Sequence, residues 1–70
     1  MMQIDEVREM STNDLLDELE DLKAELYRLR FQKETGQLED VNLIRYNKRT
    51  VGRIKMVLRE RQIAAEAEEN

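Results

Sequence analysis

The sequence predicts an all-α fold, an antiparallel two-helix coiled-coil hairpin preceded by a short helical arm. Charged residues and hydrophobic residues each make up 40% of the 70-residue chain, and there is no proline. This composition is typical of long amphipathic helices. Of the two glycines, only Gly36 lies among turn-forming neighbours, in Thr35-Gly36-Gln37. The chain is therefore expected to break once, near its middle, and to fold back on itself.

The first long helix is expected over residues 12–34. Ser11 precedes it and Asp14 follows three residues later, a spacing typical of a capped helix start. Leucines then recur with alternating spacings of four and three residues, at Leu15, Leu19, Leu22, Leu26 and Leu29. A heptad stripe of this kind indicates packing against a partner helix and carries no chemistry of its own.

A turn over residues 35–39 is expected to lead into a second helix over 41–62. Gly36 suits the left-handed conformation that ends many helices, and Asp40 suits the cap of the next one. The stripe of the second helix, which would face the leucines, is formed by Ile44, Asn47, Val51, Ile54 and Leu58. Asn47 is its only polar member.

The two ends of the chain are predicted to differ in structure. Residues 3–9 are expected to form the helical arm, and residues 63–70 a frayed acidic tail. A chain of this length forms one small domain, and a hairpin that buries one stripe per helix gains little beyond the entropy cost of ordering it. The chain is therefore expected to need a partner.

The composition excludes most catalytic chemistry. There is no histidine and no cysteine, so the usual general base, the thiolate nucleophile and the soft metal ligands are absent. We expect no enzyme, no cofactor, no metal site and no small-molecule substrate. No uncharged apolar run approaches the roughly 18 residues of a membrane span, and the N-terminal stretch is acidic, so neither a membrane span nor a signal peptide is predicted and a cytoplasmic location is expected.

The charges are unevenly distributed. The whole chain has a net charge of −4, yet residues 27–61 hold ten basic and four acidic side chains, whereas residues 1–26 hold two basic and nine acidic ones. A projection of the second helix at about 100° per residue gathers six cations opposite the predicted stripe. This basic strip consists of Arg45, Lys48, Arg49, Arg53, Lys55 and Arg59.

Gly52 projects to the centre of the basic strip. A glycine inside a helix costs about 1 kcal/mol relative to alanine, but its small size lets a phosphate backbone approach closely. A cationic strip of this kind suits the backbone of a nucleic acid.

Other interpretations remain open at this stage. A basic helix face is often only a solvated surface, and Gly52 can be a tolerated residue without a contact. Phe31 is compatible with stacking on a base, but packing on Leu38 at the end of the hairpin is the favoured role. The acids Asp17, Asp21 and Glu25 at four-residue spacing are ordinary for an exposed helix and do not indicate a calcium site.

A second class of function is self-association into a four-helix bundle. It would use apolar residues left outside the predicted stripes, such as Leu16, Met56 and Val57. This alternative requires no RNA.

Several motifs in the sequence resemble the L29 family of large-subunit ribosomal proteins. They are ELYRLRFQ at 25–32, TGQLE at 35–39, Ile44-Arg45, Arg53-Ile54 and VLRER at 57–61. The resemblance extends from about Val7 to Gln62. It implies a helical hairpin bound to large-subunit ribosomal RNA near the polypeptide exit, beside the ribosomal protein numbered twenty-three, with no catalysis.

The resemblance also implies RNA-facing positions. Around the turn they are Arg28, Arg30, Phe31, Gln32, Thr35, Gly36 and Gln37, and on the second helix they are Arg45, Lys48, Arg49 and Arg53. Together with Gly52, Lys55 and Arg59 from the charge pattern, these residues form the predicted RNA-binding site. Relatives usually carry arginine at position 48, and lysine keeps the charge but loses the two-pronged hydrogen bonding to phosphate.

Overall fold

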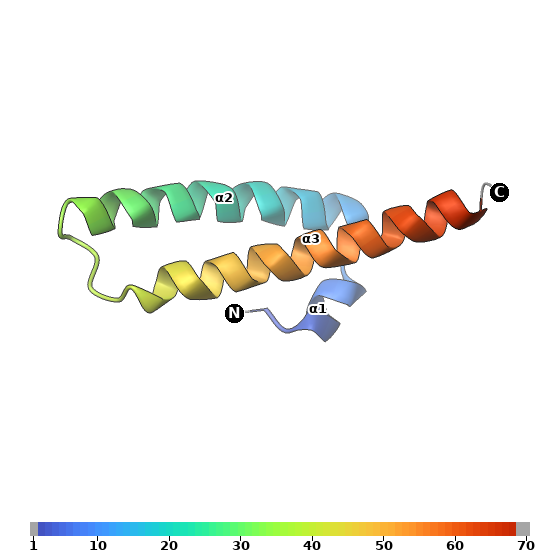
Figure 1. Cartoon of the computed structure of the whole chain (residues 1–70), viewed down its shortest axis with the longest axis horizontal. Helices are drawn as coiled ribbons and strands as arrows, with labels where there is room; N and C mark the ends of the chain where they lie inside the picture. Colours follow the sequence, from blue (N-terminus) through green and yellow to red (C-terminus); the bar gives the residue numbers. More distant parts are fainter. Residues whose placement is uncertain (1, 69–70) are drawn as a thin grey trace.

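This computed structural model describes residues 2–68 of the chain, which contain three helices and no strand. They are α1 (Ile4–Glu9), α2 (Thr12–Glu34) and α3 (Asn42–Glu68). The two long helices lie side by side in opposite directions, and α1 packs against α3 (Figure 1). The molecule is an elongated rod of 52 × 18 × 15 Å. The prediction of an all-α helical hairpin with an N-terminal arm is confirmed.

Helix α2 begins and ends as its sequence signals predicted. The hydroxyl of Ser11 accepts a hydrogen bond from the backbone N–H of Asp14 at 3.1 Å. At the other end Gly36 has a φ of 75°, and its N–H donates to the Lys33 carbonyl at 3.2 Å. The N–H of Gln37 donates to the Gln32 carbonyl at 2.8 Å. This paired pattern is the Schellman motif, which satisfies carbonyls that the helix end leaves free.

Helix α3 begins near the predicted position but ends later. The side chain of Asp40 accepts a hydrogen bond from the Asn42 N–H at 2.9 Å, so it caps the start of the helix. The helix then continues to Glu68, whereas a frayed tail was expected from residue 63. Three alanines between Ile63 and Glu68 explain the extension, because alanine has the highest helix propensity. The last two residues of the expected tail lie outside the described range.

The core lies near the middle of the rod, where all three helices meet. Leu15 and Leu19 of α2 pack with Ile54 and Val57 of α3, and Val7 of α1 completes the cluster with no exposed surface. Each fully buried aliphatic side chain stabilises the fold by about 1.5 to 3 kcal/mol. The arm is therefore part of the core and not a loose appendage.

The buried surface of α3 is wider than the predicted stripe. Thr50, Ile54 and Val57 are its most buried residues, whereas Val51 and Leu58 are only partly buried. The prediction assumed one packing partner, but α3 contacts both α2 and α1. The second partner moves the centre of burial around the helix toward Val57.

The burial of Val57 corrects one prediction. Val57 is only 2% exposed, so it is unavailable for the self-association surface to which the sequence assigned it. The hydroxyl of Thr50, also buried, donates to the Tyr46 carbonyl at 3.2 Å and so has a partner inside the protein. Of the three residues proposed for that surface, Leu16 and Met56 remain exposed.

Arg61 fastens the arm to the hairpin. Its guanidinium donates to the carbonyls of Met10 at 2.8 Å and Arg8 at 3.2 Å, and to the Thr12 hydroxyl at 3.0 Å. These groups lie at the end of α1 and the start of α2, so one side chain of α3 holds the junction between them. No role for Arg61 was predicted, since contacts this distant along the chain leave no periodic signal.

Asn47 occupies the predicted polar position in the α3 stripe, where it is half-buried. Its side-chain amide has no hydrogen-bond partner within residues 2–68, and it reaches solvent, because no unpartnered side-chain nitrogen or oxygen atom in that range is buried. Asn47→Val is expected to stabilise the free chain by about 1 kcal/mol, because a valine at this half-buried position buries more apolar surface than asparagine does. This corresponds to a rise in melting temperature of roughly 4 to 8 °C.

Thermal melts in the absence of RNA measure this effect, with Asn13→Val on the exposed surface of α2 as the control. Equal melts for Asn47→Val and wild type would show that the position does not face α2. Oligomerisation of the valine variant in analytical ultracentrifugation would instead show that Asn47 prevents association of an exposed stripe.

Candidate nucleic-acid interface

The exposed part of the basic strip lies on the outer side of α3, and at its edge Lys48 borders a hollow that Lys33 of α2 also lines. Ile54 points into the core, and at about 100° per residue Arg45, Arg49 and Arg59 project to the opposite side, whereas Lys48 and Lys55 project to one flank. All of these side chains are exposed, at Arg45, Lys48, Arg49, Lys55 and Arg59. Glu60, the one nearby acid, lies toward the arm and pairs with Arg8 at 3.4 Å. The exposed strip therefore carries positive charge without an interposed carboxylate.

Most of these cations have no partner in the part of the chain that the structure describes. Arg45, Lys48, Arg49 and Lys55 form no hydrogen bond or ion pair among residues 2–68, and Arg59 contacts only the neutral amide of Gln62. Lys23 and Arg28 of α2 differ, because each pairs with a glutamate. Unpaired like charges on one face repel one another, and a phosphate backbone would neutralise them and release its counterions.

Gly52 lies within the exposed strip, as predicted. A Cβ atom placed on Gly52 would meet nothing within 4 Å. Packing inside the chain therefore gives no reason for a glycine at this position. Any requirement for a small residue here must come from a molecule bound to the strip.

Arg53 departs from the rest of the strip. It is half-buried, and its guanidinium donates to the Met2 carbonyl at 3.0 Å. The arm thus occupies one side of the strip and engages this arginine. The sequence projection did not include the arm as a packing partner and therefore placed Arg53 with the free cations.

The predicted turn residues have two roles, since some shape the backbone and others present side chains at the surface. Thr35 and Gly36 shape the backbone, since the Thr35 hydroxyl donates to the carbonyls of Phe31 and Gln32 at 3.2 and 3.1 Å. Gln32 is half-buried, and Gln37 is exposed at the tip. The turn presents a fixed backbone shape, and the side-chain amides of Gln32 and Gln37 have no hydrogen-bond partner among residues 2–68.

The aromatic residues beside the turn point into solvent. Phe31 is 60% exposed and Tyr27 78% exposed, and together with Arg30 and Glu34 they line a shallow hollow on α2. Phe31 therefore does not bury its ring at the end of the hairpin, as the favoured packing interpretation required. Its open face is suited to stacking on a base or sugar.

Arg28 is the one predicted site residue with an acidic partner. Hydrogen bonding to Glu25 and the charge of that carboxylate raise the pKa of the Arg28 guanidinium above its ordinary value. The pair is exposed, so it contributes little to stability. A phosphate would have to compete with Glu25 for this side chain.

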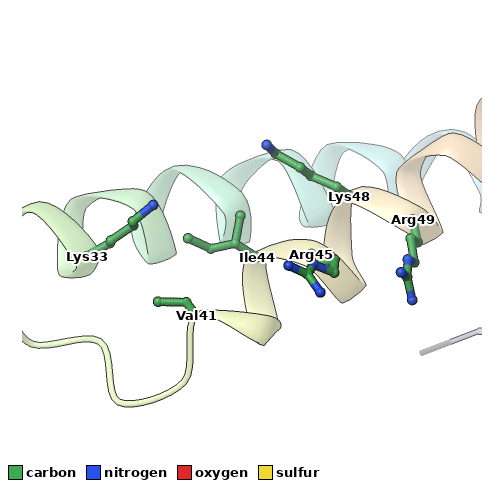
Figure 2. A pocket seen from close by; sticks show the side chains of 6 residues that line it. All are labelled: Lys33, Val41, Ile44, Arg45, Lys48 and Arg49. Atoms are coloured by element: carbon green, nitrogen blue, oxygen red, sulfur yellow. The ribbon is translucent and has the colours of Figure 1, made fainter.

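The two long helices separate toward the turn and leave an open groove of about 370 Å³ (Figure 2). It is lined by Lys33 of α2, by Val41 just before α3, and by Ile44, Arg45, Lys48 and Arg49 in the first turns of α3. The sequence did not assign Lys33 to the site. The signal was present, because Lys33 follows Leu29 by four residues and so continues the leucine stripe as a cation.

The structure places the predicted site residues in two neighbouring areas, the turn end of α2 and the outer face of α3. Within residues 2–68 no group of three acidic side chains is arranged to hold a metal ion. Across the same range, no helix combines the length and the apolar character that a membrane crossing requires.

Comparison with known proteins identifies the family. The model of the family described as "Ribosomal L29 protein" matches residues 5–61. A Thermoanaerobacter sp. protein is 50% identical over 62 residues, which cover 89% of this chain and 90% of the relative. A Caldicellulosiruptor bescii protein is 49% identical over 65 residues, covering 93% and 90%. A Geobacillus sp. protein is 44% identical over 66 residues, covering 94% and 97%.

All three relatives are named "Large ribosomal subunit protein uL29". The alignments span nearly the whole of each chain, and the family match includes both long helices and the turn between them. The chain therefore belongs to the ribosomal L29 protein family, and it is a structural ribosomal protein and not an enzyme.

Proposed function

We propose that this chain is a structural constituent of the large ribosomal subunit and binds large-subunit ribosomal RNA near the polypeptide exit. Binding uses the turn and the exposed strip of α3. The unpaired state of Arg45, Lys48, Arg49 and Lys55 carries this proposal. Four adjacent exposed cations without an acidic neighbour are arranged to neutralise successive phosphates.

The proposed contacts are of three kinds. Strip cations bind phosphates, Gly52 permits close approach of the backbone, and Phe31 stacks on an exposed base or sugar. The turn fixes the position of α2 relative to α3 and so sets the distance between the stacking and phosphate contacts. Arg53 has a smaller role than its neighbours, because it already binds the arm.

The acidic half of the chain is proposed to face away from RNA. Most of the acids of α1 and α2 are exposed and lie outside the α3 strip, which accounts for a net negative chain that binds a polyanion. Family resemblance supports the ribosomal protein numbered twenty-three as a neighbour and the cytoplasm as the location. These acidic surfaces are available to protein partners of that kind.

Replacing Arg45 and Arg49 together with glutamine tests the proposed strip. The double variant is expected to bind deproteinised large-subunit RNA more weakly, and the slope of log affinity against log salt should fall by roughly one unit for each phosphate that is no longer bound. Circular dichroism should be unchanged, because both side chains are exposed and unpaired. Lys23→Gln, which removes an exposed cation of α2 that pairs with Glu20, is the control and should leave the slope unchanged. A wild-type slope in the double variant would show that the strip is not the RNA surface.

A further inference from the structure

The groove at the turn end of the hairpin has an unusual lining. The stripe of α2 that is apolar from Leu15 to Leu29 ends at Lys33, which faces the start of α3 across the groove. In Figure 2 the side chains of Lys33 and Lys48 slope toward one another above Ile44, whereas Arg49 points the other way. A lysine thus occupies the place where a further leucine would close the hairpin.

No acid balances these charges. The residues lining the groove include four cations and no carboxylate. Neither Lys33 nor Lys48 has a hydrogen-bond or ion-pair partner among residues 2–68. Two unpaired ammonium groups that slope together from opposing helices repel each other, and an anion between them would relieve the repulsion.

The floor of the groove has a different character. Val41 is 57% exposed, and Ile44 is half-buried beside it. Both side chains therefore offer apolar surface to a molecule in the groove. A ligand that is anionic at one end and flat and weakly polar at the other matches both parts of the lining.

We propose that this groove binds one unpaired nucleotide of the RNA, a contact that rests on the proposed function and extends it beyond the strip. Its phosphate lies between Lys33 and Lys48, and its sugar or base covers Val41 and Ile44. The volume of about 370 Å³ lies at the lower end of the roughly 300 to 1,000 Å³ typical of small-ligand sites. A single nucleotide fits this space. The flanking Arg45 and Arg49 then bind the phosphates that follow along the strip.

The test uses the full chain and deproteinised large-subunit RNA, with affinity measured over a range of salt concentrations. Lys33→Gln and Lys48→Gln are each expected to weaken binding, and the double variant to lower the salt slope by about 0.7 to 0.9, the value for one phosphate. Lys23→Gln is the matched control, since it removes a lysine of α2 outside the groove. Val41→Ser removes apolar surface without changing charge, so it should weaken binding several-fold at every salt concentration and leave the slope unaltered.

Two results would overturn the proposed groove site alone. One is a double lysine variant that has the same affinity and the same salt slope as the wild type, when the wild type itself binds RNA in a salt-dependent way. The other is wild-type affinity in Val41→Ser, because a bare phosphate contact would not depend on the apolar floor. Failure of the wild-type chain to bind RNA with any salt dependence would overturn the proposed function, and the groove site with it.

Discussion

Ile54→Ala is expected to lower the melting temperature of the free chain by at least about 8 °C, because the cost of such a truncation is roughly 2 to 5 kcal/mol. Ile54 has no exposed surface and packs with residues from all three helices, including Val7 and Leu15. A domain of this size is stabilised by only about 0.05 to 0.15 kcal/mol per residue. Removing part of this side chain therefore takes away a large fraction of the total stability.

Thermal melts followed by circular dichroism measure this loss. Leu16→Ala is the matched control, since Leu16 is 46% exposed on α2 and its truncation should change stability by no more than about 0.5 kcal/mol. Similar melting temperatures for the two variants would contradict the location of the core between the three helices.

Gly52→Glu is expected to abolish incorporation into large ribosomal subunits. It places a bulky carboxylate at the centre of the exposed cations, where it repels phosphate and blocks its approach. Gly52→Ala should instead stabilise the helix by about 1 kcal/mol, because the added Cβ meets nothing within 4 Å. Its incorporation should remain close to that of the wild type.

Tagged variants expressed in cells and separated on sucrose gradients provide the measurement. Gly52→Gln separates bulk from charge, since it is similar in size to glutamate and neutral. Ala24→Glu, at an exposed position of α2, shows whether an added carboxylate elsewhere has the same effect. Normal incorporation of Gly52→Glu would mean that no phosphate backbone approaches this part of α3.

Local sequence signals predicted the fold well wherever they act over a few residues. Ser11, Gly36 and Asp40 each form the cap or turn expected of them, because such geometry depends on nearby backbone groups. The leucine stripe of α2 was correct for a related reason. A helix of 23 residues gives a periodic pattern enough repeats to be recognised.

Local signals and helix periodicity did not predict that the arm packs into the core. Helix α1 has six residues, too few to show a periodicity, so the complete burial of Val7 had no signal in the sequence. The errors on α3 follow from this omission. The helix projection places Val57 outside the core and Arg53 among the free cations, although α1 packs on that side of the helix.

The sequence predicted which residues give the candidate site its positive charge, but it did not predict the shape of the groove. Residues 45–59 were recognised from their projection around one helix, which needs no tertiary information. The groove between Lys33 and Lys48 depends on how far α2 and α3 separate near the turn, and the sequence does not encode that distance in any single residue. The exposure of Phe31 likewise depends on where the chain passes after Gly36.

Sedimentation with and without ribonuclease shows whether RNA holds this chain in the large subunit. The tagged chain in a cell lysate is expected to co-migrate with large subunits, and nuclease treatment should abolish the co-migration. A chain that sediments as a self-associated species, unchanged by nuclease, would show instead that RNA does not hold it and would favour a bundle formed through Leu16 and Met56.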